Sequence, residues 1–194
     1  MKKPILYRIV RPFIKIWFKI TYRPTFINHN IIPKKGRAIL AGTHVSKKDV
    51  FIVLSSTKRS VRGVAKDELF NGPFKFFFKG MGAIPVNRRI EDKTVVPACV
   101  NILNEDGLVG IMPEGTINRT DDIIMPFKTG AVRMAIESNS PIIPFAIVGE
   151  YKAFKKSVRI VFGEPYHPVT TDVETETKRL ENKVIALIQG QCEG

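Results

Sequence analysis

Short apolar runs recur along the chain and alternate with longer segments of helical character. Each run has the length and composition of a short buried strand: 38–41, 61–65, 108–112, 142–148 and 158–162. Helices are expected between and after these runs, at 46–57, 93–104, 129–137 and 172–189. Strands that alternate with helices favour a single α/β domain, with a mixed sheet flanked by helices. Because Pro144 cannot donate a ladder hydrogen bond, we expect 142–148 to be an edge strand or a broken one.

The positive charge of the chain is concentrated in its first quarter. The 194 residues, enough for one domain with a substantial core, carry a net charge of +13. Residues 1–48 hold twelve of the 31 Lys and Arg residues and none of the 18 Asp and Glu residues, so the rest of the chain is nearly neutral. This asymmetry is typical of a protein that meets an anionic surface, either a membrane or nucleic acid.

Residues 4–20 combine large apolar side chains with regularly spaced basic ones. The four basic residues follow one another at intervals of three, four and four positions, which places them on one stripe of a helix. The charges exclude a transmembrane span, and the cleavage region of a signal peptide is absent. We expect a helix in the bilayer interface, kinked or split at Pro12; the alternative is a core-packed helix with a solvated edge. The residues expected to contact the membrane are Arg8, Arg11, Phe13, Lys15, Trp17, Phe18 and Lys19.

These patterns predict two parts of the chain. Residues 1–29 are expected to form a basic amphipathic membrane-association segment, and residues 30–194 the α/β domain, which should fold without residues 1–22. The predicted location is peripheral, on the cytoplasmic face of the cell membrane. Cys99 and Cys192 lie far apart, which suggests a reducing compartment and offers neither a disulfide framework nor a metal site.

A histidine follows the first predicted core strand at a turn into a helix. His44 precedes Asp49 by five residues, and Ser46 and Asp49 have the spacing of a capping box at a helix start. Within one helix the His44 and Asp49 side chains would lie about 140° apart, but across a turn they can meet. Asp49 would then accept a hydrogen bond from one ring nitrogen and leave the other as a base. The alternative is a plain helix cap beside a structural histidine.

Four stretches of the chain, taken together, resemble the motifs of the lysophospholipid acyltransferase family. They are residues 44–49 (HVSKKD), 82–88 (GAIPVNR), 112–116 (MPEGT) and 141–144 (PIIP). Their order and spacing agree with the family, and the resemblance covers roughly residues 30–165. One departure concerns the third motif, after which the family usually has Arg-Ser directly. Here Ile117 and Asn118 come before Arg119.

The resemblance implies acyl transfer from a thioester, either acyl-CoA or acyl carrier protein, to the sn-2 hydroxyl of lysophosphatidic acid, which gives phosphatidic acid. His44 would be the general base and Asp49 would orient it. No metal and no cofactor are implied. The substrate-binding residues implied by the motifs and by a further family-like stretch at 128–131 are Arg88, Glu114, Gly115, Thr116, Arg119 and Lys128.

Other functions stay open at this point. The displaced Arg119 leaves room for another lysolipid acceptor. A protein of a different class would bind anionic lipid or nucleic acid without catalysis. The intact pair of His44 and Asp49 argues against a non-catalytic protein. We expect no nucleic-acid partner, because the basic stripe borders an unusually apolar face and no nucleic-acid motif is present.

Overall fold

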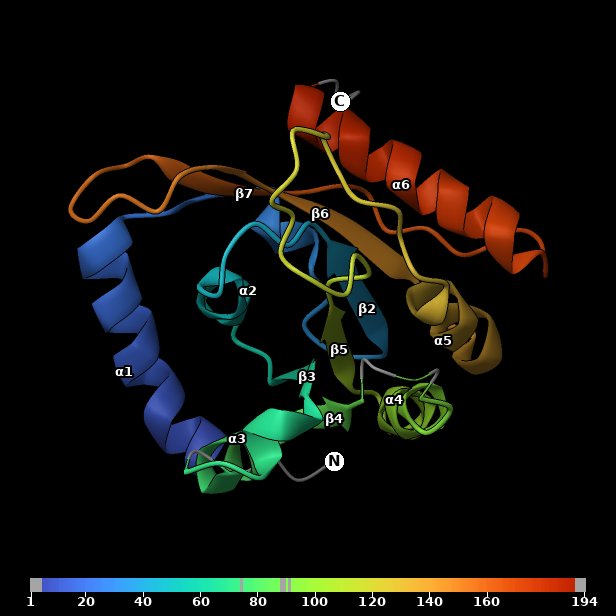
Figure 1. The fold of residues 1–194 in the computed structure, drawn as a ribbon, viewed down its shortest axis with the longest axis horizontal. Helices are drawn as coiled ribbons and strands as arrows, with labels where there is room; N and C mark the ends of the chain where they lie inside the picture. Colours follow the sequence, from blue (N-terminus) through green and yellow to red (C-terminus); the bar gives the residue numbers. More distant parts are fainter. Residues whose placement is uncertain (1–4, 74, 88–89, 91, 191–194) are drawn as a thin grey trace.

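A mixed β-sheet forms the centre of the computed structural model, which describes residues 5–73, 75–87, 90 and 92–190. Within this part of the chain the sheet has seven strands in the order β1-β7-β6-β2-β5-β3-β4 (Figure 1). The strands are β1 (Thr25–Ile27), β2 (Ala38–Gly42), β3 (Val61–Lys66), β4 (Ile84–Val86), β5 (Leu108–Ile111), β6 (Ile142–Gly149) and β7 (Val158–Phe162). All neighbouring pairs are parallel except β6 and β7. The predicted α/β domain with a mixed sheet is therefore confirmed.

Helices cover both faces of the sheet. They are α1 (Ile5–Tyr22), α2 (Asp49–Ser56), α3 (Lys75–Met81), α4 (Val95–Asn104), α5 (Gly130–Ser138) and α6 (Val173–Gln189), with 3₁₀ turns at His29–Ile31 and Asp67–Phe70. Alternate strand residues point to opposite faces, so Ile39 packs in the cluster of α4, α5 and α6, while Leu40 packs in the cluster of α1, α2 and α3. Because both faces are covered, the central strands are continuous apolar runs rather than alternating ones.

Of the two arrangements expected for the strand around Pro144, the edge position is wrong, and an interruption of its pairing is what the structure contains. β6 runs between β2 and β7 in the interior of the sheet. Its ladder to β7 begins only at Phe145, and Ile142 is paired separately with Tyr166. Pro144 falls between these two pairings, and its carbonyl accepts a hydrogen bond from the Gly163 N–H. Pro144 has no N–H to donate, but at this position the ladder between β6 and β7 is already interrupted, so no ladder hydrogen bond is lost.

Helix α1 is built into the core, which differs from the separable segment expected at residues 1–29. The helix is continuous through Pro12. Tyr7 and Phe18 are buried against α2 and the sheet, so removal of residues 1–22 would expose the core. β1 also pairs with β7, and the sheet thus begins before residue 30.

Two residues expected to contact a membrane face inward instead. Phe18 is fully buried among aromatic side chains of the core. Arg11 donates hydrogen bonds to the carbonyls of Leu54 and Thr57 at the carboxyl end of α2. A cation is stabilised there by the unpaired carbonyls and the negative end of the helix dipole. The side chain of Arg8 lies outside the described part of the structure.

The outer face of α1 is apolar and open to solvent. Five large side chains are at least half exposed along it: Ile9, Phe13, Ile16, Trp17 and Ile20. Lys19 is exposed beside them, and Lys15 is half-buried, which lowers the pKa of its ammonium group. None of the helices within the described residues is long and apolar enough to cross a membrane.

Candidate active site

Two chain segments leave the sheet side by side at the carboxyl ends of β2 and β5. These strands are parallel neighbours, with Ala41 opposite Ile111. The turn that carries His44 and the loop that carries Glu114 therefore meet at one edge, where open α/β sheets bind their ligands. Gly42 is required at the end of β2, because a Cβ atom there would lie 1.9 Å from the Phe145 carbonyl oxygen.

His44 and Asp49 form a hydrogen-bonded dyad across the turn. The distance between His44 Nδ1 and Asp49 Oδ2 is 2.9 Å. Asp49 is fully buried, and the N–H groups of Val45 and Ser46 donate to the same oxygen at 2.7 and 2.8 Å. A carboxylate with these donors accepts from the ring, so Nδ1 carries the hydrogen and Nε2 is left as the base. The His44 side chain is 15% exposed, so the dyad can reach a substrate.

The turn differs in one detail from the predicted helix cap. Helix α2 begins at Asp49, and its N-cap is Lys48 rather than Ser46. The Ser46 N–H still donates to the Asp49 carboxylate, so one arm of the capping box is present. Asp49 therefore supports both the start of the helix and the histidine ring, and the expected contact between His44 and Asp49 across the turn is present.

A tyrosine that the sequence did not reveal completes the environment of Asp49. The Tyr151 hydroxyl donates to Asp49 Oδ1 at 2.8 Å. Its ring packs against Phe18 and Tyr22 of α1, and the Lys48 ammonium lies 5.6 Å from the ring centre. Burial, with the nearby Asp49 carboxylate, raises the pKa of Tyr151, so the phenol remains a donor. Tyr151 is 102 positions from Asp49 in sequence and belongs to no motif, so no local signal points to it.

Glu114 holds the loop after β5 against the histidine turn. Its carboxylate is buried and accepts hydrogen bonds from the N–H groups of His44 at 2.6 Å and Met125 at 2.9 Å. The Asn118 N–H donates to the His44 carbonyl at 2.8 Å. Burial raises the pKa of Glu114, while these bonds oppose the shift. Both carboxylate oxygens accept from backbone N–H groups, so Glu114 shapes the site by fixing the backbone.

Four of the other predicted substrate-binding residues lie on the same loop: Gly115, Thr116, Arg119 and Lys128. Gly115 has a φ of +72°, which favours glycine, and a Cβ atom there would lie 3.0 Å from Lys128 Cε. Thr116, Arg119 and Lys128 are exposed. Arg88 lies outside the described residues, so its predicted role is not addressed by the structure.

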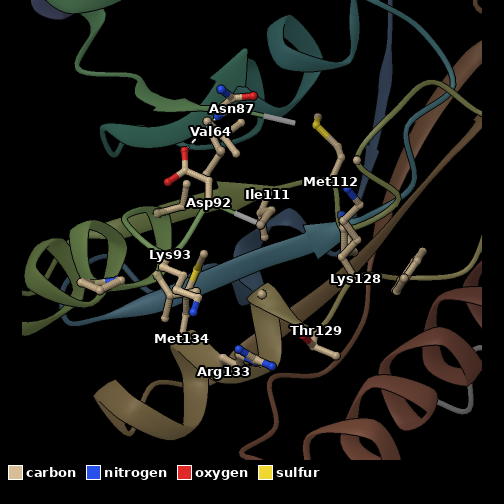
Figure 2. Close-up of a pocket in the computed structure, with 18 of the residues that line it drawn as sticks. Val64, Asn87, Asp92, Lys93, Ile111, Met112, Lys128, Thr129, Arg133 and Met134 are labelled. Carbon is tan, nitrogen blue, oxygen red and sulfur yellow. Dashed lines mark hydrogen bonds between the residues drawn. The ribbon is translucent and has the colours of Figure 1, made fainter. Parts of the chain in front are cut away.

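A cavity of about 840 Å³ opens beside this loop (Figure 2). Apolar side chains of β3, β4, β5, α4 and α5 line its interior, among them Val64, Val95, Ile111 and Met134. Polar and charged groups also surround it: Asn87, Asp92, Lys93, Lys128, Arg133 and Glu137. His44 does not line the cavity, but Gly115 does, and it adjoins the glutamate bound to the His44 backbone. The volume is in the range of small-molecule sites. Within the described residues no cluster of His, Cys, Asp or Glu could hold a metal ion.

Residues 23–148 match the acyltransferase family. This match spans more than half of the chain, so the chain belongs to that family, as the four motifs predict. The 1-acyl-sn-glycerol-3-phosphate acyltransferase of Bacillus subtilis is 26% identical to it, over 92% of this chain and 98% of the relative. The corresponding protein of Borreliella burgdorferi is 32% identical, over 66% of this chain but only 52% of the relative.

A solved structure has the same fold. The 1-acyl-sn-glycerophosphate acyltransferase PlsC of Thermotoga maritima superimposes with a TM-score of 0.77 at 19% sequence identity. The match covers 95% of this chain and 79% of that one. The two chains therefore share one fold over nearly the whole of this chain.

Proposed function

We propose that this enzyme transfers a fatty acyl group from a thioester to the sn-2 hydroxyl of lysophosphatidic acid and so makes phosphatidic acid. The observation that carries the proposal is the 2.9 Å bond between His44 Nδ1 and the fully buried Asp49, which leaves Nε2 as a base. Family membership and the names of the two relatives support the reaction and the acceptor.

In this mechanism His44 Nε2 removes the proton of the acceptor hydroxyl as its oxygen attacks the thioester carbonyl. Asp49 holds the ring tautomer and stabilises the imidazolium that forms. The tetrahedral intermediate then expels the thiolate, to which the imidazolium returns the proton. The donor is acyl-CoA or the thioester of acyl carrier protein, and no metal or cofactor takes part.

The acceptor phosphate requires cations near the histidine. Lys128 is exposed at the cavity beside Gly115, and the loop with Arg119 leaves the same strand end. Arg88 is assigned to the phosphate only by its motif. Thr116 lies next to Gly115 and offers a hydroxyl to the acceptor.

The outer face of α1 fits an enzyme whose lipid substrate and product lie in a bilayer. Its exposed apolar stripe includes Phe13 at 70% and Trp17 at 50%, and Lys19 lies alongside. Such a face would lie in the interface of an anionic membrane, and the enzyme would be peripheral on the cytoplasmic face.

Acyl transfer by the purified protein tests the reaction. Lysophosphatidic acid is offered with acyl-CoA and with acyl carrier protein thioester separately, and His44→Ala is the control. Phosphatidic acid from the wild type alone supports the proposal and names the donor. Transfer only to another lysolipid would keep the chemistry and reassign the acceptor, and no transfer to any acceptor would favour a non-catalytic lipid-binding protein.

Vesicle sedimentation tests the membrane face. Phe13→Glu should lower the binding to phosphatidylcholine vesicles that contain an anionic lipid by at least about tenfold, because one buried aromatic side chain contributes about 1.5–3 kcal/mol. Val169→Glu is the matched control, because Val169 is equally exposed, at 73% against 70%, and lies far from α1 in sequence. Equal binding by the two variants would argue against α1 as the membrane face.

A further inference from the structure

We propose that Tyr151 is a positioning residue for the dyad, which it serves by holding Asp49 through a hydrogen bond from its hydroxyl. This role rests on the proposed function, because Asp49 acts there through His44. Neither the four motifs nor the matched family segment includes Tyr151, since that segment ends at residue 148. The residue reaches the site from the connection between β6 and β7.

The two oxygens of Asp49 are held in different ways. Oδ2 accepts from His44 Nδ1 and from the N–H groups of Val45 and Ser46, all of which belong to the same turn. Oδ1 accepts from Tyr151, and no second donor to it is found among the described residues. The local turn therefore fixes one oxygen, and the Tyr151 hydroxyl fixes the other. Without the Tyr151 hydroxyl, the buried Oδ1 of Asp49 would lose its hydrogen-bond donor. The plane of the carboxylate could then rotate away from His44.

Tyr151 is itself held from several directions. Its ring centre lies 5.9 Å from that of Phe18 and 5.7 Å from that of Tyr22, both on α1. The Phe154 N–H also donates to the Thr21 carbonyl, so the connection between β6 and β7 is attached to the end of the same helix. A side chain held at its ring can place its hydroxyl with little freedom, which suits a positioning role.

Lys48 strengthens this arrangement from the turn itself. Its ammonium lies 5.5 Å from the centre of the Tyr22 ring and 5.6 Å from that of Tyr151. A cation near the face of an aromatic ring is attracted by the ring quadrupole. The residue next to Asp49 thus contacts the same ring whose hydroxyl binds Asp49, and turn, tyrosine and α1 form one assembly.

The alternative is that Tyr151 only fills space. Tyr151→Phe separates the two roles, because it keeps the ring against α1 and removes the hydroxyl alone. We expect kcat to fall about tenfold and KM to stay within about twofold of the wild-type value. The loss of a hydrogen bond to a charged group corresponds to about a tenfold or larger change in rate. In an Asp49→Asn background the same substitution should have almost no further effect on kcat.

Tyr7→Phe is the matched control. The Tyr7 hydroxyl is hydrogen-bonded too, but away from the dyad: it donates to the Arg59 carbonyl and accepts from the Val61 N–H. This variant should lose stability and keep its kcat. Unchanged kcat in Tyr151→Phe, or a loss that simply adds to that of Asp49→Asn, would overturn the proposal.

A spectroscopic measurement separates this proposal from the reaction itself. The proton on His44 Nδ1 should give a downfield NMR signal, assigned by its absence in His44→Ala. Tyr151→Phe should shift or broaden that signal, and Tyr7→Phe should not. The same signal in wild type and Tyr151→Phe would overturn the proposal. A changed signal in a protein that transfers no acyl group would retain the positioning role and reject the proposed reaction.

Discussion

The two sides of the candidate active site are built very differently. On the base side, Asp49 is fully buried and four hydrogen bonds hold its carboxylate. On the proposed acceptor side, Thr116, Arg119 and Lys128 are exposed on a loop. The contrast suggests that the chemistry depends on a fixed group, whereas acceptor recognition depends on side chains that can adapt. Substitutions on the base side should therefore change kcat, and those on the acceptor side should change KM.

The largest effect is expected at the base itself. His44→Ala removes Nε2, and kcat should fall by about 10²–10⁴-fold, which is the usual contribution of a general base. Steady-state acyl transfer measures the loss, and the urea midpoint should stay near that of the wild type because the N–H groups of Val45 and Ser46 still donate to Asp49 Oδ2.

Near wild-type turnover in this variant would remove His44 from the mechanism. It would also show that substitutions on the base side change kcat no more than substitutions on the loop with Thr116, Arg119 and Lys128.

Glu114 connects the two sides, so its loss should affect stability. Glu114→Ala leaves the N–H groups of His44 and Met125 without an acceptor, and the free energy of unfolding should fall by about 1–3 kcal/mol. Urea denaturation at neutral pH gives the value.

The pH dependence gives a sharper test of Glu114. Because burial raises the pKa of Glu114, the folded state holds the proton more tightly than the unfolded chain. Proton binding by Glu114 therefore adds to the stability of the folded state at pH values below the ordinary pKa of a glutamate. This contribution is lost as the pH rises through the raised pKa of the folded state. As the pH rises between the ordinary and the raised pKa of Glu114, the difference in the free energy of unfolding between wild type and Glu114→Ala should become smaller. A difference that does not change with pH would show that the pKa of Glu114 is not raised in the folded state.

Much of the base side is encoded locally in the sequence. The apolar run before His44 predicts β2, and the spacing to Asp49 predicts a contact across a turn; the structure contains both. Tyr151 escapes prediction because its contact depends on the order of β2 and β6 in the sheet, which no local pattern contains. The same is true of Arg11, because helical periodicity shows a basic stripe but not which cation turns toward the end of α2.

The interior position of Pro144 has a related cause. The rule that confines proline to edge strands concerns the loss of one ladder bond. Here that bond would fall where β7 has not yet joined β6, so the loss is avoided by a feature of the neighbouring strand. A pattern within one segment cannot predict such compensation by another.

On the acceptor side, the larger effect should come from Lys128. Lys128→Ala should raise the KM for lysophosphatidic acid about tenfold and leave kcat within about twofold, because a charge-assisted contact to phosphate is lost while the dyad is intact. Lys93→Ala is a suitable control, since Lys93 lies at the same cavity but on the segment before α4. An equal rise in KM for both variants would point to the general field of the cavity rather than to a direct contact.

The smallest effect should come from Arg119. Its side chain is exposed on a loop that is two residues longer before the arginine than the family motif. An exposed ion pair contributes about 0.2–1 kcal/mol, so Arg119→Ala should raise KM by about fivefold at most. High salt should reduce the difference from wild type further, because exposed charges are screened. A loss in kcat as large as that of Tyr151→Phe would instead mean that this loop is fixed in the working enzyme, and the contrast between a rigid base side and an adaptable acceptor side would no longer hold.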